Sequence, residues 1–222
     1  MQYTKFSRTG FSVSRLSIGT ATFGKQTEES VSLQILDKAA DAGVNFIDVA
    51  DYYPMAADPS QFGLSEEICG RWLKGKRSRF IVATKAGLPI GPLSWDQGGS
   101  RKHLLGAIDA SLRRMGTDYV DLYQLHVDDP ETPIDETLEA FDLIVRSGKA
   151  RYIGVSNMLA YRLARAVGRS EVLRVARYVS VQPRYSLLLV TPPGAGREHR
   201  GNTVQSTRGW FADWKVSSRC SP

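Results

Sequence analysis

The chain has few of the residues that build disulfide frameworks and metal centres. It contains two cysteines, Cys69 and Cys220, and three histidines, His103, His126 and His199. The cysteines lie far apart and no close Cys/His spacing occurs, so the pattern argues against both a disulfide scaffold and a zinc site. We expect Cys69 to be a packing residue on a helix face, and we expect no bound metal.

Long apolar runs are also missing. No uninterrupted apolar stretch approaches the roughly 18 residues of a membrane span, and the opening MQYTKFSRTGFSVSRLS lacks the apolar segment of a signal peptide. These absences favour a cytoplasmic protein without membrane contact. The composition, with 42% hydrophobic and 23% charged residues over 222 positions, is typical of one globular domain.

The chain also lacks an evenly spread excess of positive charge. The net charge is +6, but residues 190–222 hold five Arg and Lys against two Asp and Glu, so half of the excess lies there. The preceding 189 residues carry only +3. Because the distribution of charge matters more than its total, we interpret this as an ordinary solvated surface and expect no nucleic-acid partner.

Helices and strands alternate along most of the chain. Polar and apolar positions alternate over residues 3–17 around Thr9-Gly10, which predicts a β-hairpin. Apolar periodicity then predicts five helix-strand pairs. The helices are expected at 28–43, 64–75, 100–116, 132–148 and near 158–168, and the strands at 44–49, 79–85, 119–126, 150–157 and 178–189.

Capping residues mark several of these helices. Thr27 and Ser100 stand where side-chain caps are expected, and Gly43 and Gly116 stand just past the predicted helix ends. Pro133 occupies the expected first helical position, where its missing N–H is not needed.

Continuous apolar strands that alternate with helices predict an α/β fold with a parallel sheet covered on both faces. Two architectures have this pattern, an open doubly wound sheet and a (β/α)₈ TIM barrel. No G-x-G-x-x-G stretch follows the first long strand, which disfavours a doubly wound dinucleotide-binding sheet.

Polar side chains gather where the predicted strands end. The stretch NFIDVADYY, residues 45–53, places carboxylates and phenols directly behind an apolar run. Later strands end in Thr84-Lys85, His126, Ser156-Asn157 and Gln182. A barrel brings such ends to a single face, where barrel enzymes build their sites, so we expect one site assembled from successive strands.

Four of these side chains suit acid-base chemistry at a carbonyl group. A phenol with a pKa of about 10 is a poor acid near neutral pH, but a nearby ammonium stabilises the phenolate. Lys85 can supply that ammonium for Tyr53, and Asp48 can keep the lysine charged. His126 can orient a bound C=O, so the group predicts a proton donor beside a polarised carbonyl.

At this point the sequence resembles the aldo-keto reductase family. The resemblance runs from the hairpin to about Leu189. It rests on the ordered motifs LSIGTATFG, FIDVADYY, GLSEEICGRWL, VATKAG, YVDLYQLHVDD, RYIGVSN and VQPRYSLL.

The resemblance implies a (β/α)₈ barrel with an N-terminal hairpin that binds NADPH without a Rossmann fold. It implies reduction of a small aldehyde or ketone, with Tyr53 as proton donor, Asp48 and Lys85 tuning it, and His126 placing the carbonyl. Six positions are implied to bind the cofactor, namely Gly19, Thr20, Asp48, Ser156, Asn157 and Gln182.

The resemblance stops after Leu189. Residues 190–222 contain no Leu or Ile, yet they carry two of the four tryptophans. As a hypothesis, we attribute this to a shifted reading frame. If each codon is read one nucleotide later, the codons of residues 204–216, VQSTRGWFADWKV, can encode YSPLAGGLLTGKY. Tryptophan has a single codon, and in the shifted frame that codon gives glycine at positions 210 and 214. That run matches the family pattern.

We therefore divide the chain into an incomplete barrel domain, 1–189, truncated after about six strands, and a frameshifted, disordered tail, 190–222. Loss of the segment that grips the cofactor makes activity doubtful. Two alternatives remain open: a cofactor-binding regulatory subunit similar to potassium-channel β subunits, and a non-functional product of a frameshifted gene. The substrate, the preference between NADPH and NADH, and the oligomeric state are left open by the sequence.

Overall fold

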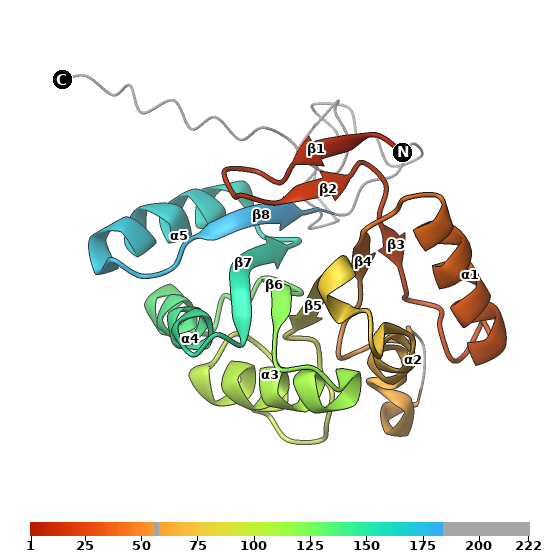
Figure 1. Ribbon diagram of the computed structural model, residues 1–222. Coiled ribbons are helices and arrows are strands. Elements are labelled where there is room, and N and C mark those ends of the chain that lie inside the picture. The colour runs from red at the N-terminus through yellow and green to blue at the C-terminus, as the bar shows by residue number, and fades with distance from the viewer. Residues whose placement is uncertain (56–57, 184–222) are drawn as a thin grey trace, which may run out of the picture.

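The computed structural model describes residues 1–55 and 58–183 of the protein. At its centre is a parallel sheet of six strands in the order β3-β4-β5-β6-β7-β8. These are Ile18–Gly19, Phe46–Asp48, Ile81–Ala86, Val120–Leu125, Ala150–Ser156 and Tyr178–Gln182. The sheet curls, and the helices lie outside it (Figure 1). This arrangement confirms the prediction of part of a (β/α)₈ barrel.

Five α-helices connect the strands on the outer side of the sheet. They are α1 (Glu29–Asp41), α2 (Leu64–Leu73), α3 (Arg101–Met115), α4 (Ile134–Arg146) and α5 (Ala160–Leu173). Two 3₁₀ turns, η1 (Pro59–Gln61) and η2 (Arg77–Arg79), flank α2. No helix in the described ranges is long and apolar enough to cross a membrane.

The predicted hairpin is confirmed, with β1 (Tyr3–Lys5) antiparallel to β2 (Ser12–Ser14). The C-terminal part of the predicted strand 178–189 and the whole of the predicted tail 190–222 lie outside the described residues.

The helix ends agree with most of the predicted caps. The Ser100 hydroxyl accepts a hydrogen bond from the His103 N–H at 3.3 Å, and Gly116 ends α3 with a φ of 61°. The Thr27 prediction is wrong, because Glu28 is the N-cap residue of α1 and the Thr27 hydroxyl instead pairs with Thr22.

Two other helix boundaries differ from the prediction. Pro133 is the N-cap residue of α4 and not its first helical residue. Helix α5 continues to Leu173, past the expected end near 168, because the first left-handed residue after it is Arg174, with a φ of 54°. Glycine was therefore not needed to end this helix, although it is the residue that usually does so.

The main core lies between the sheet and the helices. It contains Cys69 of α2, a free thiol that is completely buried, as predicted. Burial raises the pKa of this thiol to about 12. Cys69 is thus an unreactive packing residue at neutral pH.

A second, smaller core lies on the inner side of the curled sheet, where the hairpin packs. Phe6 and Val13 of the hairpin segment contact the inward residues Phe46, Ala83 and Leu122. Successive residues of a strand point to opposite faces, so the next inward positions are Asp48, Lys85 and Gln124. Each of these strands therefore changes from apolar to polar along its inner face, and the polar end is its carboxyl end.

Candidate active site

The predicted site residues come from neighbouring strands at the carboxyl edge of the sheet. Asp48 is the last residue of β4, Lys85 lies near the end of β5, and His126 directly follows β6. Tyr53 lies in the loop after β4, and its N–H donates to the carbonyl oxygen of Ala50 at 3.1 Å. Parallel pairing of β4 with β5 and of β5 with β6 brings these ends together.

Lys85 is the centre of the site and is 1% exposed. Its Nζ donates to Asp48 Oδ2 at 2.7 Å, to the carbonyl oxygen of Val49 at 3.1 Å and to the Tyr53 hydroxyl at 3.4 Å. These three bonds use all the donors of an ammonium group. Burial alone would lower the pKa of Lys85, but Asp48 and Tyr53 raise it above its ordinary value. The lysine is therefore cationic, and it holds the phenol oxygen.

His126 lies beside the phenol and is neutral. The rings of Tyr53 and His126 meet edge to face, with centroids 5.6 Å apart. Burial, with a smaller contribution from the Lys85 charge, lowers the pKa of His126 to about 3. Its Nδ1 is buried and has no hydrogen-bond partner within residues 1–55 and 58–183. A neutral imidazole with a free ring nitrogen can bond a carbonyl oxygen or a hydroxyl group.

Amide and hydroxyl groups form the other side of the site. Gln182 donates from Nε2 to Asp48 Oδ2 at 3.2 Å and accepts at Oε1 from Gln124 Nε2 at 3.0 Å. Ser156 donates its hydroxyl to the carbonyl oxygen of Gln182 at 2.8 Å, and Asn157 Nδ2 donates to Ser156 Oγ at 3.1 Å. One hydrogen-bonded chain thus links the ends of β7 and β8 to Asp48.

The two remaining predicted residues lie at the end of β3 with different surroundings. Gly19 pairs with Asp48 in the sheet, is exposed, and has open space where a Cβ would lie. Thr20 is completely buried; its hydroxyl donates to the carbonyl oxygen of Asp48 at 3.1 Å and accepts from Ser65 at 2.8 Å. The Thr20 side chain therefore faces the protein interior, whereas Gly19 leaves room for a ligand.

The sequence reasoning missed a buried polar network behind the site. Glu66 of α2 is completely buried, accepts from Thr84 Oγ1 at 2.5 Å and pairs with Arg114 Nε at 2.7 Å. Asp51, in the loop that carries Tyr53, is 1% exposed, and its two carboxylate oxygens have no partner in the described part of the chain. Burial, reinforced by Glu66, raises the pKa of Asp51 well above its usual range.

Gln124 was also missed, although the sequence contained its signal. It precedes His126 by two residues, so strand alternation places it on the same inner face. A period-2 reading of strand 119–126 predicts that position.

The sequence also matches a known protein family. The model of the Aldo/keto reductase family matches residues 15–201. The chain belongs to the aldo/keto reductase family. The match covers every site residue described above and extends past Leu189.

Curated relatives of this chain include enzymes and a channel subunit. The uncharacterized oxidoreductase YrpG of Bacillus subtilis is 40% identical over 196 residues, which cover 85% of this chain and 59% of YrpG. The L-glyceraldehyde 3-phosphate reductase of Escherichia coli is 36% identical over 193 residues, covering 85% of this chain and 54% of the enzyme. A probable voltage-gated potassium channel subunit beta of Arabidopsis thaliana is 37% identical over 191 residues, which cover 84% of this chain and 56% of the channel subunit.

The chain spans less than two thirds of the length of these relatives. Family membership and the oxidoreductase names among the relatives support an oxidoreductase.

Proposed function

We propose that this chain carries the acid-base half of a carbonyl reductase site, which reduces an aldehyde or ketone to an alcohol with NADPH as the reductant. The observation that carries the proposal is the contact of Tyr53, Lys85 and Asp48. One ammonium lies 3.4 Å from a phenol oxygen and 2.7 Å from a carboxylate oxygen. Such a phenol is suited to give up a proton, since the ammonium stabilises the phenolate that remains.

Each residue has a distinct proposed role. Tyr53 donates its proton to the carbonyl oxygen of the substrate, and Lys85 holds the phenol oxygen in place. Asp48 keeps Lys85 charged despite its burial. His126, which is neutral, uses a ring nitrogen to orient the substrate oxygen beside Tyr53.

The polar groups around this centre fit a nicotinamide cofactor in part. A nicotinamide carboxamide needs hydrogen-bond donors and acceptors, and Ser156 and Asn157 lie together at the end of β7. The Gln182 amide already bonds Asp48 and Gln124, so it is less free to meet a ligand. Open space at Gly19 allows close approach to the end of β3. When bound, the cofactor would supply the hydride.

A second candidate is a cofactor-binding regulatory subunit, favoured by the similarity to the probable potassium channel subunit of Arabidopsis thaliana. It would retain the same residues, so geometry does not separate the two. Turnover separates them, because a regulator binds NADPH without rapid reduction of an added aldehyde.

The deciding experiment measures NADPH oxidation with a simple aromatic aldehyde for the 222-residue chain and for Tyr53→Phe. Removal of the proton donor should slow turnover by about 10²- to 10⁴-fold, while NADPH affinity, followed by fluorescence quenching, stays unchanged. Tyr161→Phe is the matched control, since Tyr161 is 69% exposed on α5. Equal turnover of Tyr53→Phe and the parent chain would contradict the proposed role.

A further inference from the structure

A basic cleft lies at the opposite end of the sheet from the candidate active site. It has a volume of about 690 Å³ and is formed where α2 and α3 end. Five cations line it, Arg71, Lys74, Arg77, Arg113 and Arg114, together with one carboxylate, Glu67.

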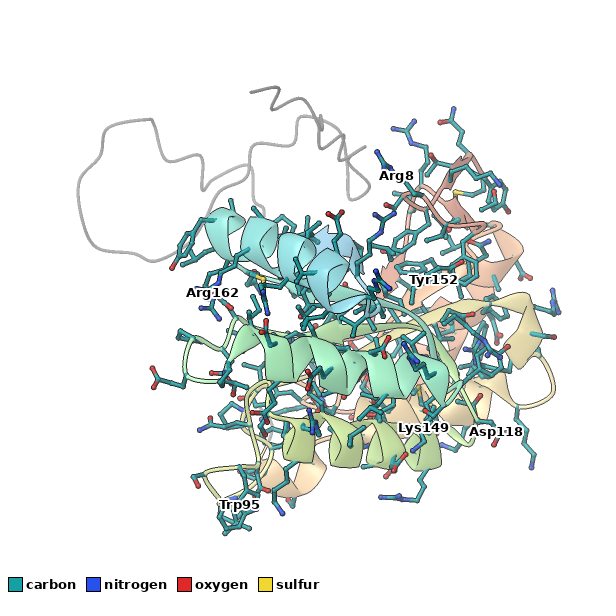
Figure 2. The ribbon with its side chains drawn as sticks, turned by 90° about the vertical axis from the view of Figure 1, so that its left-hand side faces the viewer. Arg8, Trp95, Asp118, Lys149, Tyr152 and Arg162 are labelled. Carbon is teal, nitrogen blue, oxygen red and sulfur yellow. The ribbon has the colours of Figure 1, made fainter. Side chains whose placement is uncertain are left out.

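The position of the cleft follows from chain order. Its lining residues 73–77 precede β5, and residues 113–117 precede β6, so it lies at the amino ends of these strands. Figure 2 shows Asp118, the next residue along the chain, at one end of the molecule, and Trp95 and Arg162 at the other. A ligand in this cleft would therefore not meet Tyr53 or His126.

Two of the cations are paired with carboxylates that lie deeper in the protein. Arg114 bonds Glu66 at 2.7 Å, with side-chain exposures of 22% and 0%. Arg77 bonds Asp121 at 2.7 Å, and both side chains are largely buried. The Arg114 guanidinium lies against Gly63 at the start of α2, and Arg77 also donates to the carbonyl oxygens of Phe80 and Tyr119, so both groups are engaged within the protein.

Three further groups lack a partner in the part of the chain that the structure describes. The exposed side chains of Lys74 and Arg113 make no ion pair or hydrogen bond there. The Nε of Arg77 is buried and has no acceptor. The cleft thus offers two exposed cations, Lys74 and Arg113, that are not committed to a partner in this part of the chain.

Helix electrostatics offer a simpler account of some of these residues. Arg71 lies in the last turn of α2, and Arg113 and Arg114 lie in the last turn of α3. Cations there stabilise the helix through its dipole. Lys74 is the C-cap residue of α2 and belongs to the same account, whereas Arg77 lies in η2. A helix-dipole role alone predicts no saturable binding of an anion.

We infer that this cleft is a second binding site, which takes a small molecule bearing at least two linked phosphate groups. Two free cations call for a ligand with more than one negative charge, and guanidinium and ammonium groups both bind phosphate oxygens well. The volume lies within the range of small-molecule sites. This inference does not depend on the proposed reductase function.

The test is a calorimetric titration of the 222-residue chain with inorganic tripolyphosphate at low ionic strength. The test variant is Lys74→Glu/Arg113→Glu, and the control is Arg8→Glu/Lys38→Glu, which alters the net charge equally at exposed positions on the hairpin and on α1. Circular dichroism confirms that each variant is folded. A milder variant, Lys74→Gln/Arg113→Gln, serves if the charge reversal does not fold.

We expect saturable binding with one site per chain. The test variant should lose at least about tenfold in affinity, and the control no more than about twofold. If ADP competes with tripolyphosphate in the parent chain and in the control, the site also accepts nucleotide phosphates. If ADP does not compete, the site accepts only inorganic polyphosphate. The inference is overturned if no saturable binding occurs, or if both double variants lose affinity equally.

Discussion

The Nζ of Lys85 lies 2.7 Å from Oδ2 of Asp48, and the two residues are 1% and 5% exposed. Such a buried pair does not need to stabilise the fold in net terms, because desolvation of the two charges offsets much of their attraction. Removal of one partner, however, leaves the other charge buried and alone. The pair therefore couples the stability of the barrel to the candidate site.

Lys85→Met and Asp48→Asn should each destabilise the protein by about 3–5 kcal/mol, because each leaves the remaining buried charge without its ion-pair partner. The double variant should lose much less than the sum of the two, since both charges are gone. Urea unfolding followed by circular dichroism measures all three free energies. Additive losses would show that the two side chains do not depend on each other.

Asp51→Asn should make stability less sensitive to pH. The folded-state pKa of Asp51 is raised, mainly by burial, so folding favours the protonated carboxyl. That contribution is complete below the unfolded-state pKa of about 3.9 and is lost as the pH rises from there toward the folded pKa.

The Asp51→Asn variant should therefore gain stability relative to the parent chain over the range upward from about pH 4, because the parent loses that contribution as the pH rises. Urea midpoints across this range provide the measurement. The matched control is Asp41→Asn at the exposed end of α1, which should follow the parent at each pH. A constant offset between Asp51→Asn and the parent chain would mean that Asp51 ionises normally in the fold.

Much of the site could be predicted because strand ends are visible in the sequence. Asp48, Lys85 and His126 follow apolar runs, and parallel pairing requires those ends to meet. The ion pair of buried Glu66 with partly exposed Arg114 could not be predicted in the same way. Both residues lie on helices, where charged residues normally face water, and only the packing of α2 against α3 buries Glu66 and brings Arg114 to it.

Local capping rules succeeded where one side chain satisfies one backbone group, as at Ser100. They failed at Thr27, where two neighbouring residues could begin the helix and the threonine hydroxyl had another partner in Thr22. The cap prediction was wrong because that competing bond joins residues five positions apart in a loop whose shape the sequence does not specify.

Ser100→Ala should cost about 1 kcal/mol, the usual contribution of a side-chain N-cap. The hydroxyl is the acceptor for the His103 N–H, and alanine leaves this donor without a partner. Ser100→Asp should restore most of the stability, since a carboxylate also accepts that bond and favours a helix N-terminus. Chemical denaturation of the three proteins gives the comparison, and equal stability of Ala and Asp at this position would contradict the cap.

Substitution by alanine at two helical glycines should change the stability of the fold in opposite directions. A Cβ added at Gly70 of α2 would lie 2.6 Å from the backbone of Met115 in α3, whereas a Cβ at Gly106 of α3 would meet nothing within 4 Å. Gly70→Ala should therefore separate the two helices and destabilise the fold by about 1–3 kcal/mol. Gly106→Ala should stabilise it by about 0.5–1 kcal/mol, because alanine favours the helix and no neighbour is displaced. Thermal and urea unfolding of both variants measure these changes; if Gly70→Ala were as stable as Gly106→Ala, the close contact between α2 and α3 would be wrong.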